Sequence, residues 1–181
     1  MNAAREAIVH IGHKKTGTSF IQHQFHRHRA ALLEHKVLYP LREPNHSFAL
    51  SGLFKRRNPA RAPSPLDHYL GQGEQALAAL DGELAAAKWT QLMLSGEALT
   101  GFSQRELFDL RDWLGRHVAT VTIVLVVRDP VAWAVSVAQE HLKTRGDVEA
   151  VLTSPGAAKW REIAERFRRV FGADAVTVLE Y

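Results

Sequence analysis

The stretch that decides the fold is AIVHIGHKKTGTSFIQ, residues 7–22. Residues 7–11 form a short apolar run, which is typical of a buried strand. Residues 12–19 contain two glycines, two lysines and three hydroxyl side chains. From Phe20 onward, the apolar side chains Phe20, Ile21 and Phe25 recur at helical spacing. The stretch therefore predicts a strand, a tight loop and a helix.

A loop that leads directly into a helix favours the binding of an anion. The first backbone N–H groups of a helix lack intrahelical partners, and the helix dipole places partial positive charge there. Gly12 and Gly17 allow the backbone to approach a ligand closely, and Lys14 or Lys15 adds a full charge. The predicted ligand is a phosphate or a chemically related group.

The glycines have the spacing of the nucleotide-triphosphate P-loop, G-x-x-x-x-G-K-[ST]. Thr18 nevertheless follows Gly17 where that motif has lysine. The loop instead resembles that of sulfotransferases that use 3′-phosphoadenosine 5′-phosphosulfate (PAPS), K-[TS]-G-T-[TS]. The matching residues are Lys15, Thr16, Gly17, Thr18 and Ser19. A P-loop nucleotide kinase and a simple basic turn before an amphipathic helix are the alternatives.

Strands and helices alternate along the rest of the chain. We expect helices over residues 17–35, 47–54, 74–88, 103–117, 160–171 and from 130, and strands over 37–39, 91–95, 121–127 and 175–180. This order predicts an α/β fold of three layers, a parallel sheet of about five strands with helices on both faces. The resemblance adds that the fold is like that of P-loop NTPases. Such sheets bind ligands at the carboxyl ends of their strands, where Gly12, Ser95 and Arg128 fall.

The length of 181 residues predicts a single domain, residues 1–181. Residues 40–70 carry five of the seven prolines and a basic run, and we expect them to form an irregular excursion on the substrate side. The family's chains continue beyond the strand that ends this sequence. The resemblance therefore predicts a domain that lacks C-terminal elements, and a fragment stays open as an alternative.

Arg128 follows the most apolar strand and precedes a predicted helix that Asp129 caps. Arginine suits phosphate because its guanidinium donates two parallel hydrogen bonds. In the family, an arginine at this strand end and a serine eight positions later bind the 3′-phosphate of PAPS, which corresponds to Arg128 and Ser136. Bacterial members share further short matches, namely Leu38-Tyr39-Pro40, Ser95-Gly96-Glu97 and Pro130 with Trp133.

The resemblance implies transfer of a sulfuryl group from PAPS to an acceptor hydroxyl or amine. Negative charge then develops on the oxygen that links sulfur to the 5′-phosphate, and Lys15 is the candidate to stabilise it. The acceptor needs a general base within hydrogen-bond reach. Glu97, after the strand that ends at Ser95, and His46, in the proline-rich excursion, are the two candidates.

The composition excludes several classes of protein. There is no cysteine, so disulfides and thiolate metal sites are absent, and the histidines of the first quarter have no H-E-x-x-H motif. We expect no metal, and no nucleic acid partner despite the net charge of +4, because the arginines of residues 160–171 alternate with glutamates. The chain starts without a signal peptide or membrane span, which predicts a cytoplasmic protein. The acceptor stays open between small molecule, carbohydrate and lipid, and so do the oligomeric state and a non-catalytic nucleotide-binding module.

Overall fold

A parallel sheet forms the centre of the computed structural model, which describes residues 4–56, 73–145 and 159–181. Its strands are β1 (Glu6–Gly12), β2 (Val37–Leu38), β3 (Gln91–Ser95), β4 (Thr120–Val127) and β5 (Val176–Glu180). They lie in the order β2-β3-β1-β4-β5, and every pair is parallel. The predicted α/β class and the parallel sheet are confirmed.

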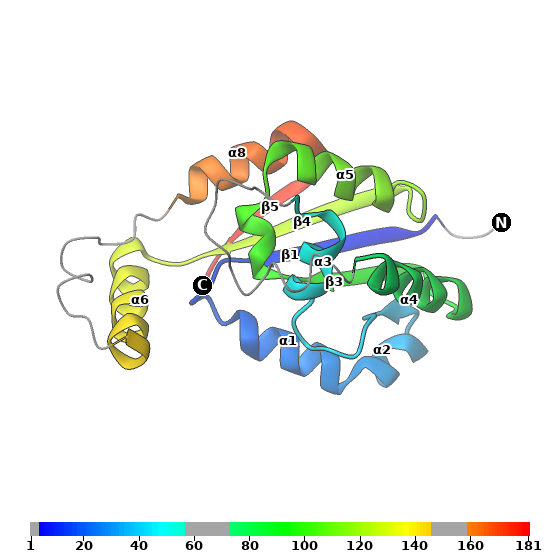
Figure 1. Ribbon diagram of the computed structural model, residues 1–181, viewed down its shortest axis with the longest axis horizontal. Helices are drawn as coiled ribbons and strands as arrows, with labels where there is room; N and C mark the ends of the chain where they lie inside the picture. The colour runs from blue at the N-terminus through cyan, green and yellow to red at the C-terminus, as the bar shows by residue number, and fades with distance from the viewer. Residues whose placement is uncertain (1–3, 57–72, 146–158) are drawn as a thin grey trace.

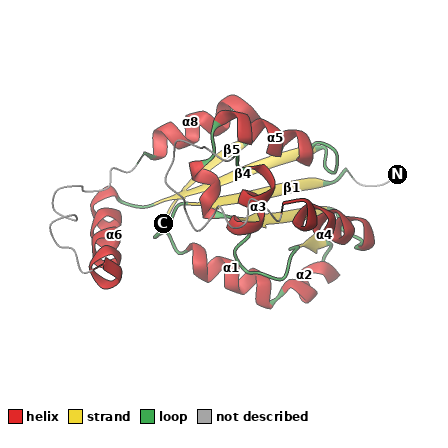
Figure 2. Cartoon of the chain, viewed as in Figure 1, coloured by secondary structure: helices red, strands yellow, loops and turns green. Residues whose placement is uncertain are grey.

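Helices cover the sheet and its ends (Figures 1 and 2). They are α1 (Thr18–Arg27), α2 (Arg29–Glu34), α3 (Ser47–Phe54), α4 (Gly73–Ala86), α5 (Gln104–Leu114), α6 (Pro130–Arg145) and α8 (Trp160–Phe171), with a 3₁₀ helix, η2 (Glu97–Gly101). Helices α4, α3, α5 and α8 contact one another in turn and form one layer. Helices α1 and α2 lie along the other side of the sheet, and α6 stands beyond the carboxyl ends of the strands.

The core forms where the apolar strand faces meet the inward stripe of this helical layer. Val9, Leu94 and Leu125 from three adjacent strands are fully buried, as are Leu110 of α5 and Phe167 of α8. Each such side chain contributes roughly 1.5–3 kcal/mol by leaving water. The apolar spacing of α5 and α8 in the sequence therefore predicts their packing correctly.

Two expectations differ from the structure. The helix predicted over residues 17–35 is divided at His28, whose φ of −100° and ψ of 13° separate α1 from α2. No glycine or proline occurs at this bend, and nothing in the described contacts explains it. The strand predicted to be covered on both faces is exposed at Thr120 and Thr122, and its fully buried residues begin at Ile123, where its pairing with β5 also begins.

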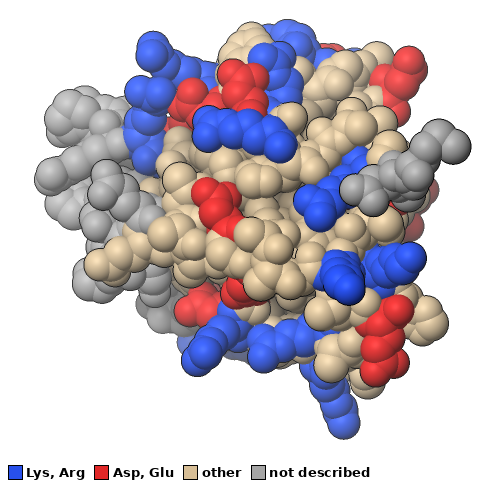
Figure 3. Space-filling view, turned by 90° about the vertical axis from the view of Figure 1, so that its right-hand side faces the viewer, with Lys and Arg blue, Asp and Glu red and all other residues tan. Residues whose placement is uncertain are grey.

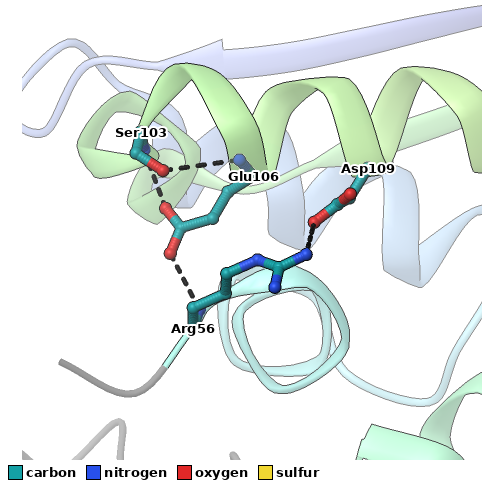
Figure 4. A network of polar contacts seen from close by, with 4 residues as sticks. All are labelled: Arg56, Ser103, Glu106 and Asp109. Carbon is teal, nitrogen blue, oxygen red and sulfur yellow. Dashed lines mark hydrogen bonds and ion pairs between the residues drawn. The ribbon is translucent and has the colours of Figure 1, made fainter.

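A polar clamp joins the described part of the excursion to α5 (Figure 4). Ser103 and Glu106 form the predicted capping box, in which the Glu106 carboxylate accepts a 2.7 Å bond from the Ser103 amide. The same carboxylate accepts a 2.8 Å bond from the Arg56 amide, and the Arg56 guanidinium donates a 2.8 Å bond to Asp109. The chain is therefore fixed at residue 56, while residues 57–70 of the predicted excursion lie outside the described residues.

The strand order brings the predicted site residues to one edge. β1 lies between β3 and β4, so Gly12, Ser95 and Arg128 end three neighbouring strands. Backbone bonds hold this edge together, with the Gly96 amide donating to His10 (2.9 Å) and the His13 amide to Val126 (3.0 Å). Within the described ranges, no helix combines the length and apolar character that crossing a membrane requires.

Candidate functional site

The anion loop, residues 12–19, connects β1 to α1 and has an unusual backbone. Gly12, Lys15 and Gly17 have φ values of 62°, 67° and 74°, in the left-handed region. A Cβ on Gly12 would lie 2.5 Å from Cγ2 of Thr18, so only glycine fits there. Lys15 adopts this conformation with a side chain, which costs free energy and is typical of functional sites. The Thr16 hydroxyl closes the loop, since it accepts from the His13 amide (3.2 Å) and donates to the His13 carbonyl.

The loop ends at the open N-terminus of α1. The Ile21 amide donates to the Gly17 carbonyl (3.2 Å) and begins the helical ladder, so the amides of Thr18, Ser19 and Phe20 have no intrahelical acceptor. No side chain caps this end, and its first turn carries no acidic residue. Uncapped amides together with the helix dipole favour an anion at this position.

Helix α6 is attached to the loop by two of its side chains. The Trp133 indole N–H donates to the Lys14 carbonyl (3.0 Å), and the Lys15 ammonium lies 2.8 Å from Oε1 of Glu140. The hydrogen bond from Lys15 is the main cause that lowers the pKa of Glu140. Ser136 is three residues after Trp133 and four before Glu140, so it shares the helix face that meets the loop. The structure thus brings Lys15 and the face of Ser136 together.

Arg128 lies at the same edge, next to an aromatic ring. Its guanidinium carbon is 5.7 Å from the centre of the Tyr181 ring, and the Tyr181 amide donates to the Val127 carbonyl (2.8 Å). A Cβ on Gly17 would lie 3.0 Å from Cε2 of Tyr181. The Tyr181 ring therefore lies between Arg128 and the anion loop. Tyr181 was not predicted from the sequence as a site residue, although its position after the last strand places it at the carboxyl edge of the sheet.

Glu97 contacts the anion loop directly. The Thr18 hydroxyl donates a 2.9 Å hydrogen bond to Oε2 of Glu97, which begins η2 just after β3. Its side chain is half-buried. One of the two candidate bases is therefore joined to a residue of the predicted anion-binding motif.

His46 lies beneath the site, with no exposed surface. Its backbone N–H donates to the Ser95 carbonyl (2.9 Å), and its Nδ1 accepts from the Ser95 N–H (3.2 Å). Burial lowers the pKa of His46 to about 4. The Ser95 hydroxyl in turn bonds Nδ1 of His10 (2.8 Å), another buried histidine. In this arrangement His46 fastens the excursion to β3 and does not reach the surface, whereas the other candidate base, Glu97, contacts the anion loop.

A cavity of about 370 Å³ opens beside the loop, and we call it the acceptor cavity because an acceptor is proposed to bind there. Its lining includes His13, Lys14, Asn45, Ser47, Lys55 and Glu97. Three segments far apart in the sequence contribute to it, namely the anion loop, the described part of the excursion and η2. Lys55 was not selected from the sequence beyond its membership of a basic run. Among the described residues, no group of three or more histidine, aspartate or glutamate side chains is placed to hold a metal ion.

The comparisons with known proteins identify a structural relative. No model of a known protein family matches the chain, and no curated protein matches its sequence. The crystal structure of a sulfotransferase from Alicyclobacillus acidocaldarius superposes with a TM-score of 0.58 at 16% sequence identity. The alignment covers 98% of this chain and 74% of that one. The chain therefore has the fold of a sulfotransferase, which agrees with the P-loop-like fold predicted from the anion loop.

Proposed function

We propose that this protein is a PAPS-dependent sulfotransferase, which transfers a sulfuryl group to an acceptor hydroxyl or amine. One observation carries the proposal: the Thr18 hydroxyl of the K-T-G-T-S loop bonds Glu97 (2.9 Å) at the wall of the acceptor cavity. The loop proposed to bind the anion and the carboxylate proposed as the base are therefore adjacent. The sulfotransferase fold of the structural relative supports the general class.

The residues of the anion loop fit the phosphosulfate of PAPS. The free amides of Thr18, Ser19 and Phe20 are donors for its oxygens, and Gly17 lets them approach. Arg128 and Ser136 would hold the 3′-phosphate. Asp129 is not a metal ligand in this account, because its carboxylate caps α6 by accepting from the Ala132 amide (2.8 Å).

Transfer exchanges one bond to sulfur for another. The acceptor oxygen attacks sulfur, the bond between sulfur and the 5′-phosphate oxygen breaks, and adenosine 3′,5′-bisphosphate (PAP) leaves. Glu97 takes the acceptor proton, since its carboxylate lies at the cavity wall. Lys15 stabilises the charge that develops on the leaving oxygen. To do so, the Lys15 ammonium must first leave its ion pair with Glu140 and contact the nucleotide instead.

The test is a transfer assay with PAPS labelled in its sulfur and a primary alcohol as acceptor. We expect labelled product and PAP in equal amounts, with no requirement for Mg²⁺. Phosphoryl transfer from ATP that depends on Mg²⁺ would instead identify a P-loop kinase. Tight binding of PAP without turnover of any acceptor would identify a non-catalytic nucleotide-binding module or a fragment.

A further inference from the structure

The acceptor cavity carries two lysines from different parts of the chain. Lys14 belongs to the anion loop and Lys55 follows α3, and both line the cavity. Neither forms an ion pair with another described residue. Glu97 accepts from Thr18, and Glu140, which does not line the cavity, pairs with Lys15 and interacts electrostatically with Lys14. The described wall of the cavity therefore has more positive than negative charge.

Lys55 is held in place by its neighbours. Its amide donates to the Ser51 carbonyl (2.9 Å), so it is fixed to the last turn of α3. The next residue, Arg56, is fixed to α5 through Glu106 and Asp109 (Figure 4). The Arg56 guanidinium is paired with Asp109 in this clamp. Of these two neighbouring cations, Lys55 is the one that lines the cavity.

The uncharged side chains of the cavity can also donate hydrogen bonds to a ligand. Asn45 uses its carbonyl oxygen to accept from the Ser47 amide (2.9 Å), which leaves its NH₂ group as the donor. The Ser47 hydroxyl accepts from the Ala98 amide (3.1 Å), so its own proton is available to a ligand. Burial lowers the pKa of His13, and its ring is therefore neutral at neutral pH. Two lysines, an amide and a hydroxyl thus face one carboxylate.

We propose that the acceptor is a small alcohol that also carries an anionic group, held by Lys14 and Lys55 while its hydroxyl faces Glu97. This inference rests on the proposed function and names the substrate class of that site. A volume of about 370 Å³ is near the lower end for ligand pockets and suits a molecule of about one ring. The anionic group is a carboxylate, phosphate or sulfate, since all three accept charge-assisted hydrogen bonds from lysine.

The test compares three acceptors built on the same ring: 4-(hydroxymethyl)benzoate, 4-methylbenzyl alcohol and 4-(trimethylammoniomethyl)benzyl alcohol, whose quaternary nitrogen cannot accept the sulfuryl group. We measure kcat/KM with PAPS and, separately, binding of each probe to the protein loaded with PAP. Both kcat/KM and the binding affinity should be roughly 10- to 100-fold higher for the carboxylate than for the neutral alcohol. The cationic probe should be the poorest. Equal values for the carboxylate and the neutral alcohol, or a preference for the cationic probe, would overturn the inference.

Lys55→Gln should remove most of the preference for the carboxylate. Lys88→Gln is the matched control, because Lys88 is exposed and lies before β3, at the other end of the strand. It should keep the preference, and both variants should bind PAP like the wild type. A preference that persists in Lys55→Gln would overturn the inference and leave the proposed function standing. Failure of the wild type to bind PAP would overturn both.

Discussion

The carboxyl edge of the sheet, where the strands end, and the amino edge, where they begin, each have a hollow lined partly by basic side chains. The two edges differ in whether helices begin or end there. At the carboxyl edge, α1, α3 and α6 begin, and the acceptor cavity there measures about 370 Å³. At the amino edge, α2, α4 and α5 end around a hollow of about 950 Å³ whose lining includes Arg5, Lys36, Lys88 and Arg116. Figure 3 shows the molecule from this second side, where basic, acidic and uncharged side chains alternate.

This difference indicates that neither volume nor the number of lysines decides which edge binds an anion. Helix C-termini carry partial negative charge, so the cations of the amino edge are balanced by backbone carbonyls. At the carboxyl edge, the helix N-termini add positive charge to that of Lys14 and Lys15. The carboxyl edge also has the anion loop, in which three residues, Gly12, Lys15 and Gly17, have positive φ. The smaller hollow is therefore the better anion site.

The largest effect should come from Glu97→Gln, which keeps the shape and the bond from Thr18 but removes the basicity. With an alcohol acceptor, kcat should fall by about 10²–10⁴-fold, the usual contribution of a positioned base, while the PAP affinity stays unchanged. Glu165→Gln on the exposed face of α8 is the control. Full activity of Glu97→Gln would exclude Glu97 as the base. His46→Asn should keep its activity, since His46 is buried.

The next effect distinguishes the lysines of the two edges. Lys15→Ala should lower kcat by about 10²–10³-fold, because the charge it contacts is largest in the transition state. Lys88→Ala, at the amino edge, should leave kcat and PAP binding unchanged. Steady-state kinetics with PAPS measure both. If the two substitutions lowered kcat equally, the two edges would not differ in function.

The buried histidine beneath the carboxyl edge should make stability depend on pH. The pKa of His46 is lowered to about 4 in the folded protein, so between about pH 6.5 and pH 4 the unfolded chain binds the extra proton. Stability should therefore fall as the pH falls through this range, by up to about 3 kcal/mol from His46. His46→Asn keeps an acceptor for the Ser95 amide and removes the titration. Urea unfolding should then depend less on pH, and parallel curves for the two proteins would contradict this assignment.

A smaller effect should come from the clamp between the excursion and α5. Glu106→Ala removes the capping box and the acceptor of the Arg56 amide. The free energy of unfolding should fall by about 1–3 kcal/mol in a urea titration, and PAP should still bind, because the clamp does not touch the anion loop. Glu165→Ala is again the control. A loss of PAP affinity with unchanged stability would place Glu106 in the site instead.

The sequence predicted the parts of this molecule that depend on local pattern. The alternation of elements, the range of α3 and the capping box of Ser103 and Glu106 all follow from neighbouring residues. The strand, loop and helix of residues 6–27 were predicted for the same reason, because strand, glycines and helix are contiguous; that the loop binds an anion is still a prediction.

What the sequence did not predict depends on contacts between distant segments. The bond between Thr18 and Glu97, the pair of Lys15 with Glu140 and the place of Tyr181 over Gly17 each join separate elements. The interpretation of His46 as a residue facing the acceptor assumed that a proline-rich segment lies at the surface. The segment instead enters the protein at His46, where Ser95 binds both its backbone and its ring. The roles of Arg128 and Ser136 remain predictions.

The most direct test of the account is a calorimetric comparison of PAP with adenosine 5′-monophosphate, which lacks only the 3′-phosphate. In the proposed function, the carboxyl edge binds one anion at the loop and a second at Arg128. PAP should therefore bind more tightly by roughly one to two decades without Mg²⁺, and Arg128→Ala should remove most of that difference. Equal affinities of the two nucleotides for the wild-type protein, or binding that requires Mg²⁺, would contradict the assignment of this edge to PAPS.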